Sequence, residues 1–260
     1  MNRARLQKIR NFQSEDWYPA LVIRPLVILI MLVIADWKPI TPNRVTTVAN
    51  LAKFAGAYLI LYPDHWVLAC ILLQVGMLLD NLDGTIARYR RIFTKFGSYY
   101  DKVSDMITWS VIMLVVGYVQ TRSTGDAKWT LLGAISCIAL NVRGYGKWLE
   151  TAESERLRWF EAKADPAGTV AKRTAPIVIK PPPERTAKDW AKWFGMKVAV
   201  VFIFEEADLW AWLGIGLLVN RPDLVLWLFA VSQAVLSMIM TIKRIVAMNT
   251  LDQKLSELDS

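Results

Sequence analysis

Four aspartates lie close together in the sequence, at spacings that place side chains on helix faces. Asp80 and Asp83 are three positions apart, and Asp101 and Asp105 are four positions apart. Residues at these spacings share one face of a helix. Two helices joined by the short basic stretch 89–96 would be antiparallel neighbours, so the two acid pairs would face each other. Carboxylate oxygens gathered in this way are typical of a site for a hard divalent cation.

A simpler interpretation is that these aspartates are helix-end carboxylates in contact with water. Basic residues that could pair with them lie nearby: Arg88, Arg90, Arg91, Lys95 and Lys102. However, a single Asp at the centre of a membrane helix costs about 2.5–3.5 kcal/mol on insertion scales, and repulsion between carboxylates adds to that cost. Four acids at helical spacing therefore favour the cation site.

Small residues flank the acids. Gly84 and Ala87 follow the first pair, and Gly97 precedes the second. Glycine inside a helix costs about 1 kcal/mol relative to alanine, so these positions indicate that something approaches the backbone closely. Together with Arg88, which is placed to reach a phosphate, they predict a site for a metal–diphosphate ligand. Packing of two helices through small residues, which is common in membranes, is the alternative.

The composition indicates which elements carry these residues. The chain has 260 residues, of which 54% are hydrophobic, and its mean hydropathy is +0.29. Stretches of about 20 residues with little charge recur, long enough to cross a hydrocarbon core. They are continuous rather than alternating, which excludes an outer-membrane barrel. The sequence predicts an all-α polytopic membrane protein and excludes a soluble enzyme, a disordered chain and a disulfide scaffold.

Six transmembrane helices are expected, preceded by an N-terminal interfacial helix. The expected spans are 45–62, 66–88, 97–120, 129–148, 198–219 and 224–246. Residues 17–37 are apolar but are interrupted by Pro19, Arg24 and Pro25, which favours a bent helix in the membrane interface over another spanning helix. Asn43 is placed to cap the first span.

The spans divide the chain into four parts. Residues 1–43 form a cytoplasmic N-terminus with the interfacial helix, and residues 44–149 hold the first four transmembrane helices with the acidic motif. Residues 150–196 are a polar cytoplasmic segment, expected to be a helix followed by an irregular loop. Residues 197–260 contain the last two transmembrane helices and the tail.

The distribution of basic residues predicts the orientation. The net charge is +8, and lysine and arginine concentrate on the side of the N-terminus, the 89–96 loop, the 150–196 segment and the tail. The positive-inside tendency makes that side the cytoplasm. We therefore expect a multi-pass protein of the cell membrane with the acids on its cytoplasmic side. The positive charge indicates contact with anionic lipid rather than with nucleic acid.

Two further basic residues lie within spans. An ionisable residue inside a membrane helix is a functional candidate, so Lys53 and Arg143 are candidates for binding an acceptor or a lipid headgroup. The alternatives are a lysine that extends along the helix to the interface and an arginine that anchors the helix at the interface.

The acidic motif resembles the signature of a known family. Asp80-x2-Asp83-Gly84-x2-Ala87-Arg88-x8-Gly97-x3-Asp101-x3-Asp105 matches, at every position, the signature of the CDP-alcohol phosphatidyltransferases, also called CDP-alcohol phosphotransferases. The segment 41–46 also looks like the one that opens the first span in many members.

The resemblance implies a set of roles for the matched residues. Two divalent ions, Mg²⁺ or Mn²⁺, would be held by Asp80, Asp83, Asp101 and Asp105. The CDP part of the donor would bind at Asp80, Asp83, Gly84, Ala87, Arg88 and Gly97. Asp105 would be the general base that deprotonates the acceptor hydroxyl. The resemblance also implies a homodimer.

The expected function is transfer of a phosphatidyl group from CDP-diacylglycerol to a polar alcohol, with release of CMP, in phospholipid biosynthesis. Inositol, inositol phosphate, glycerol 3-phosphate and serine are all possible acceptors. The alternative exchanges the roles of lipid and small alcohol: a phospho-alcohol would be transferred from CDP-ethanolamine or CDP-choline to a lipid alcohol. A divalent-cation transporter is a distant alternative, because a transport pathway needs acids through the depth of the membrane and these four lie at one side.

Overall fold

The computed structural model describes residues 17–164 and 206–259, together with residues 9, 186, 189–192 and 195. These residues are largely helical and include no strand, which confirms the all-α prediction for this part of the chain. In chain order the elements are a π-helical turn η1 (Pro19–Ile23), α2 (Arg24–Ile34), α3 (Pro42–Ile60), a 3-10 turn η2 (Pro63–His65), α4 (Trp66–Arg90), α5 (Lys95–Thr124), α6 (Lys128–Ala164), α9 (Glu206–Leu218) and α10 (Pro222–Asp259).

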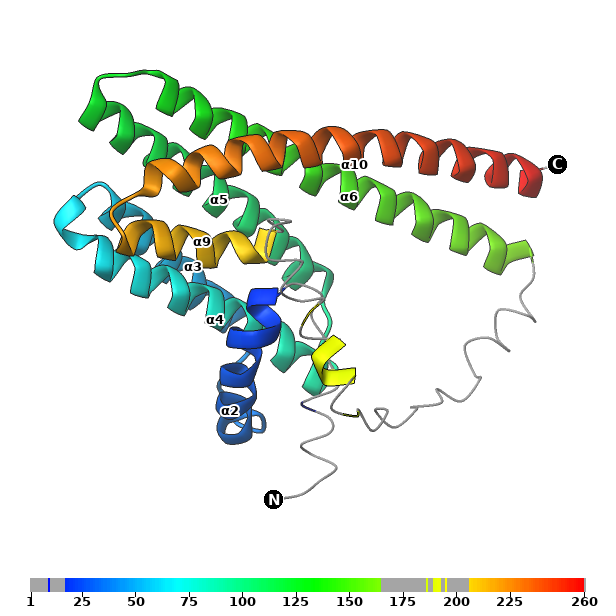
Figure 1. Ribbon diagram of the computed structural model, residues 1–260. Helices are drawn as coiled ribbons and strands as arrows, with labels where there is room; N and C mark the ends of the chain where they lie inside the picture. The colour runs from blue at the N-terminus through cyan, green and yellow to red at the C-terminus, as the bar shows by residue number, and fades with distance from the viewer. Residues whose placement is uncertain are drawn as a thin grey trace.

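Among the described residues, helices run lengthwise beside one another, and each runs opposite to the one before it (Figure 1); these are α3, α4, α5, α6, α9 and α10. Three of them are long and apolar enough to cross a membrane: Pro63–Arg90, Lys95–Thr124 and Pro222–Ser256. The helices α3, α6 and α9 lie alongside these three at the positions expected for spans. The protein is thus a membrane protein, and the count of six transmembrane helices stays a prediction.

Glycines let two of the helices approach closely. A Cβ atom on Gly117 of α5 would lie 2.6 Å from the carbonyl oxygen of Trp129, and one on Gly133 of α6 would lie 2.7 Å from that of Met113. Backbone contact of this kind is typical of helix packing in membranes. Lipid is as apolar as the helices, so close packing holds the helices together, and small residues at the interface permit it. Large apolar side chains on α10, such as Met238 and Ile242, are exposed, as on a surface that faces lipid.

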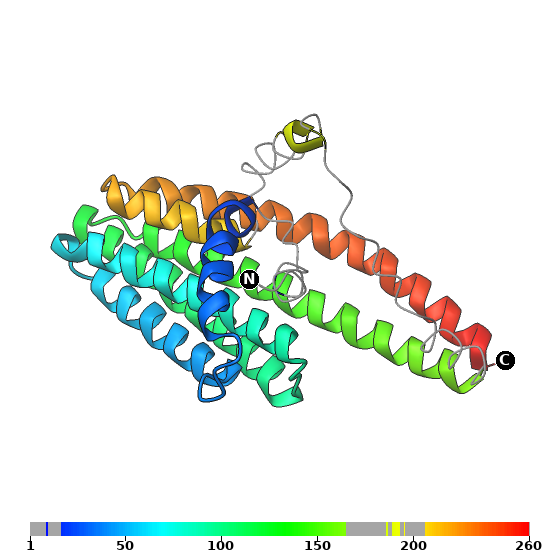
Figure 2. The ribbon, with the colours of Figure 1, turned by 90° about the horizontal axis from the view of Figure 1, so that it is seen from below.

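The segment η1–α2 crosses the bundle instead of joining it lengthwise (Figures 1 and 2). Its beginning is fixed by the backbone N–H of Tyr18, which donates to Asp208 Oδ1 at 2.9 Å. Its end is fixed by Arg90 at the end of α4, which donates to the carbonyl oxygens of Ala35 at 2.8 Å and Trp37 at 2.9 Å. The location of this segment in the membrane interface stays a prediction.

Several boundaries differ from the sequence-based ones. The helices α6 and α10 continue past 148 and 246, to Ala164 and Asp259, and run side by side beyond the other helices (Figure 2). The first part of the polar segment is therefore a continuation of the fourth expected span. Most of the rest of that segment, including the predicted irregular loop, lies outside the described residues, as do residues 198–205 of the fifth expected span.

The prediction that Asn43 caps the first span is wrong. Thr41 occupies the N-cap position of α3, and Pro42 is the first helical residue. Proline suits that position because its fixed φ matches the helix and its missing N–H would have no helical partner. Asn43 therefore lies inside the first turn.

Candidate active site

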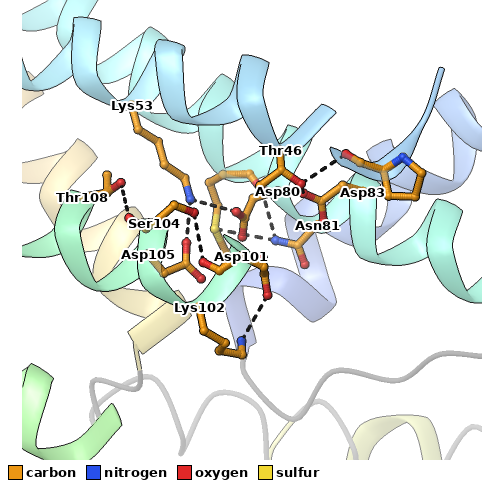
Figure 3. Close-up of polar contacts among 12 residues, drawn as sticks. Thr46, Lys53, Asp80, Asn81, Asp83, Asp101, Lys102, Ser104, Asp105 and Thr108 are labelled. Atoms are coloured by element: carbon orange, nitrogen blue, oxygen red, sulfur yellow. Dashed lines mark hydrogen bonds and ion pairs between the residues drawn. The ribbon is translucent and has the colours of Figure 1, made fainter. Parts of the chain in front are cut away.

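Three of the four motif aspartates converge between two helices. Asp80 on α4 and Asp101 and Asp105 on α5 each place a carboxylate oxygen so that all three atoms lie within 4.8 Å of one another (Figure 3). Only residues 91–94 separate the two helices along the chain, but they pack on each other little: α3 lies against both of them, and α5 also packs on α6. Arg91 ends α4 in the left-handed conformation, with φ of 56°, and Thr94 caps α5 by accepting a hydrogen bond from the Gly97 N–H at 3.0 Å.

The fourth aspartate has a different partner. Asp83 lies one turn beyond Asp80 on α4 and is 5% exposed. Its Oδ2 atom accepts a hydrogen bond from the Thr46 hydroxyl on α3, whereas it is not among the three acids that converge. Figure 3 shows Asp83 and Thr46 together at one end of the site. A buried carboxylate needs such a partner, since an unpaired one carries a large desolvation cost.

Lys53 reaches the acids from α3. Its Nζ atom lies 2.9 Å from Asp80 Oδ1 and 3.0 Å from Asp105 Oδ1, and its side chain is 1% exposed. It therefore does not extend to the interface, and the structure brings it together with two of the motif acids. Of the basic residues that the sequence offered as partners, Lys102 forms an exposed ion pair with Asp101 at 3.3 Å.

The motif glycines border polar side chains rather than another helix backbone. The atoms nearest to a Cβ on Gly84 would be the guanidinium nitrogens of Arg88, at 3.1 and 3.2 Å. Those nearest to a Cβ on Gly97 would be Thr94 Oγ1 at 2.9 Å and Asn43 Oδ1 at 3.0 Å. The helix-packing alternative is thus not supported at these two positions. Ala87 lies one turn beyond Asp83 on the same helix.

The helix α3 adds Thr46 and Asn50 beside Lys53, and these two residues did not stand out in the sequence. Thr46, Asn50 and Lys53 are spaced by four and three positions, so they share one side of α3. Asn50 is 5% exposed, and among the described residues its carboxamide has no hydrogen-bond partner. In the sequence, polar side chains at helical spacing inside an apolar span would have indicated this face.

Arg143 lies on α6, close to the level of the acids. The neighbouring Asn141 donates from Nδ2 to Ser110 Oγ on α5 at 2.9 Å, which places this part of α6 within about one helical turn of Asp105. The Arg143 guanidinium donates to the side-chain oxygen Oε1 of Gln233 on α10. Its backbone carbonyl accepts from Arg244 Nη1 at 3.0 Å.

Comparison with known proteins agrees with the motif. Residues 39–204, more than half of the chain, match the family model of the CDP-alcohol phosphatidyltransferases. The archaetidylinositol phosphate synthase of Pyrococcus horikoshii is 38% identical over 69 residues, which are 26% of this chain and 36% of that protein.

Two other relatives carry different names. The CDP-diacylglycerol–serine O-phosphatidyltransferase of Helicobacter pylori is 34% identical over 67 residues, 25% of this chain and 28% of that protein. The bifunctional IPC transferase and DIPP synthase of Aquifex aeolicus is 38% identical over 130 residues, 48% of this chain and 30% of that protein. Each match thus spans well under two thirds of the relative's length. The motif, its placement on α4 and α5 and the family match lead to one conclusion: the chain belongs to the CDP-alcohol phosphatidyltransferase family.

Proposed function

We propose that this protein transfers a phosphatidyl group from CDP-diacylglycerol to a polar alcohol and releases CMP. The observation that carries the proposal is the convergence of Asp80, Asp101 and Asp105 within a motif of this family. The name of the Helicobacter pylori relative includes CDP-diacylglycerol, which supports a CDP-linked lipid as the donor. The relatives' names differ in the acceptor, so inositol, inositol phosphate, glycerol 3-phosphate and serine all remain candidates.

The acids fit a divalent metal centre. Three carboxylate oxygens within 4.8 Å of one another form a hard, anionic donor set, which is what Mg²⁺ and Mn²⁺ prefer. We propose that two such ions bind at Asp80, Asp101 and Asp105, with Asp83 completing the set. Bound there, the ions would stabilise the negative charge of the transferring phosphate and of the leaving group.

Asp105 is proposed to accept the proton of the acceptor hydroxyl. The hydroxyl oxygen forms a bond to the β-phosphorus of the donor, the bond from that phosphorus to the CMP oxygen breaks, and the proton passes to the carboxylate. A carboxylate has two oxygens, so Asp105 can contact a metal ion through one oxygen and accept the proton on the other. General-base catalysis of this kind typically contributes about 10²–10⁴-fold.

The CDP part of the donor is proposed to lie along the α4 and α5 surfaces next to the acids. Gly84 and Gly97 leave room there because neither carries a side chain, and Ala87 adds only a methyl group. Arg88, whose guanidinium lies against Gly84, is placed to bind the diphosphate. The carboxamide of Asn50 on α3 offers a hydrogen-bond donor and a hydrogen-bond acceptor.

The acceptor is proposed to enter from the cytoplasmic side, where basic residues are concentrated. Arg143 lies at the level of Asp105 and is the candidate for binding an acceptor phosphate or a lipid headgroup. A cytoplasmic site in the cell membrane lets a membrane-bound donor meet a water-soluble alcohol. The homodimer implied by the family resemblance is part of this proposal.

The test uses the purified full chain in detergent with Mg²⁺. One set of reactions contains CDP-diacylglycerol and one alcohol at a time, and a second set contains CDP-ethanolamine or CDP-choline with diacylglycerol. We expect CMP release and a new lipid of the matching mass in one reaction of the first set, and neither from an Asp80→Asn variant. Product in the second set alone would show that the donor is a CDP-linked small alcohol and the acceptor a lipid alcohol. No product in either set would refute the proposal.

A further inference from the structure

The ammonium group of Lys53 lies between two carboxylates and an aromatic ring. Its Nζ atom lies 5.2 Å from the centre of the Trp210 ring, so an aromatic face and two carboxylates surround the ammonium group. The Trp210 ring is itself packed against that of Trp109, with centroids 4.3 Å apart. An ammonium group over an indole ring is a favourable arrangement.

The neighbouring helix makes room for the lysine stem. A Cβ atom on Gly76 of α4 would lie 2.6 Å from Lys53 Cγ and 3.1 Å from the carbonyl oxygen of Ala49. Even alanine at position 76 would therefore displace the stem. A lysine in a membrane helix can extend toward the interface, but this one is directed inward to the acids.

The two carboxyl groups that hold Lys53 are also members of the converging acid triad. Asp80 and Asp105 bind the ammonium group and, with Asp101, form the group of oxygens that fits a divalent cation. Ammonium and metal are both cations, so they repel each other at such short range. The two cannot share these carboxylates without a cost to one of them.

We infer that Lys53 is a resident cation of the metal centre, competing with the divalent ion for Asp80 and Asp105. It neutralises the two acids while no metal is bound, and it gives up at least one of them when metal binds. The inference rests on the proposed function, because it requires that the triad binds a divalent ion. It predicts that loss of the lysine charge makes metal binding tighter and makes the fold depend on metal.

The experiment measures Mn²⁺ binding by the purified full chain, from the electron paramagnetic resonance signal of free Mn²⁺. The variants are Lys53→Met, which removes the charge, and Lys53→Gln, which removes the charge but keeps hydrogen-bonding capacity. Lys102→Met is the matched control, because this lysine also pairs with a triad acid but is 53% exposed. Thermal unfolding is measured in parallel with EDTA and with saturating Mn²⁺.

We expect both Lys53 variants to bind Mn²⁺ about tenfold or more tightly than the parent, because a nearby positive charge has been removed. The control should stay within about threefold, since exposed ion pairs are weak. We also expect the gain in unfolding temperature on adding Mn²⁺ to be larger in the Lys53 variants than in the parent.

Each other outcome has a defined meaning. Equal or weaker Mn²⁺ binding by folded Lys53 variants would overturn the competition while leaving the metal centre intact. An equal gain in the Lys102 control would show an unspecific charge effect and would also overturn it. Variants that fail to fold even with Mn²⁺ would contradict the idea that metal replaces the lysine. Absence of Mn²⁺ binding in every protein would instead refute the metal centre of the proposed function.

Discussion

Thr46 on α3 binds Asp83 on α4, so this motif acid is held by a neighbouring helix while Asp80, Asp101 and Asp105 converge on one another. The bond links the N-terminal part of α3 to the C-terminal part of α4. It also keeps the side chain of Asp83 in a fixed position next to the triad. The hydroxyl of Thr46 is thus a structural part of the site, although the family motif does not include it.

Thr46→Val should destabilise the protein. The change keeps the shape of the side chain but removes the donor, and hydrogen bonds to charged groups typically contribute about 1.5–3 kcal/mol. We expect a lower midpoint of thermal unfolding in detergent with EDTA. Thr250→Val on α10 is the control, because the Thr250 hydroxyl donates to a backbone oxygen of its own helix, that of Val246 at 3.1 Å. Equal midpoints for the two variants would contradict this role of Thr46.

Gly84→Leu should weaken donor binding in a protein that still folds. The nearest neighbours of the new side chain would be the flexible end of Arg88, and the leucine would occupy the proposed nucleotide space. We expect the KM for the donor to rise about tenfold or more, equivalent to about 1.4 kcal/mol of lost binding.

Two other glycines are controls for Gly84→Leu. Gly144→Leu should leave both the KM and the fold unchanged, because a Cβ there meets nothing within 4 Å. Gly133→Leu should disrupt the packing of α5 on α6, where a Cβ would lie 2.7 Å from a backbone oxygen. An unchanged KM in folded Gly84→Leu would place the nucleotide elsewhere.

Arg90→Ala should release the segment that follows α2. Arg90 donates to backbone oxygens on this segment, including that of Ile40 at 2.6 Å. Without those bonds, local opening becomes easier. We expect chymotrypsin to cleave next to Trp37, which is 60% exposed, about tenfold faster or more in the variant, since cleavage follows local opening. Arg91→Ala, at the adjacent exposed position, should not change the rate, and equal rates for both variants would refute the anchoring role.

The sequence indicated the helices and the shared face within each acid pair because both depend on local spacing. Apolar stretches of membrane-spanning length predicted where the long helices lie, and spacings of three and four predicted shared faces. The same reasoning treated all four aspartates alike, since spacing says nothing about a partner on a third helix. The separate position of Asp83 follows from Thr46, which lies 37 residues away along the chain.

The direction of Lys53 also depends on tertiary contacts. A lysine within an apolar span is equally compatible with a stem that reaches the interface and with one that turns inward. The difference is made by Gly76 and by two acids on other helices, which no local pattern connects to position 53. The ends of α6 and α10 were underestimated for a related reason. Apolarity marks where a helix leaves the membrane and not where the helix ends.

Removal of divalent metal should abolish the proposed transfer reaction. The acids of the triad need a cation to bring a diphosphate next to them, because carboxylates and phosphates repel each other. We expect no CMP release in excess EDTA, and recovery of the full rate when Mg²⁺ or Mn²⁺ is added in excess of the chelator. Ca²⁺, added in the same way, tests whether the identity of the ion matters. Full activity in EDTA would refute a metal-dependent mechanism.

The base assignment is tested by comparing two aspartate variants. Asp105→Asn keeps the shape of the side chain and one oxygen, but it cannot accept the acceptor proton. Asp83→Asn leaves Asp105 in place and changes the acid that Thr46 holds. We expect the second variant to weaken binding of metal and donor together, and the first to retain donor binding.

The most direct measurement is the rate of CMP release by folded Asp105→Asn under saturating donor, Mg²⁺ and acceptor, with donor binding measured on the same preparation by calorimetry. The account predicts a fall in turnover of about 10²–10⁴-fold or more, the usual contribution of a general base, with donor affinity largely unchanged. Turnover close to the parental rate would contradict it, and proton removal would then belong to another carboxylate or to water.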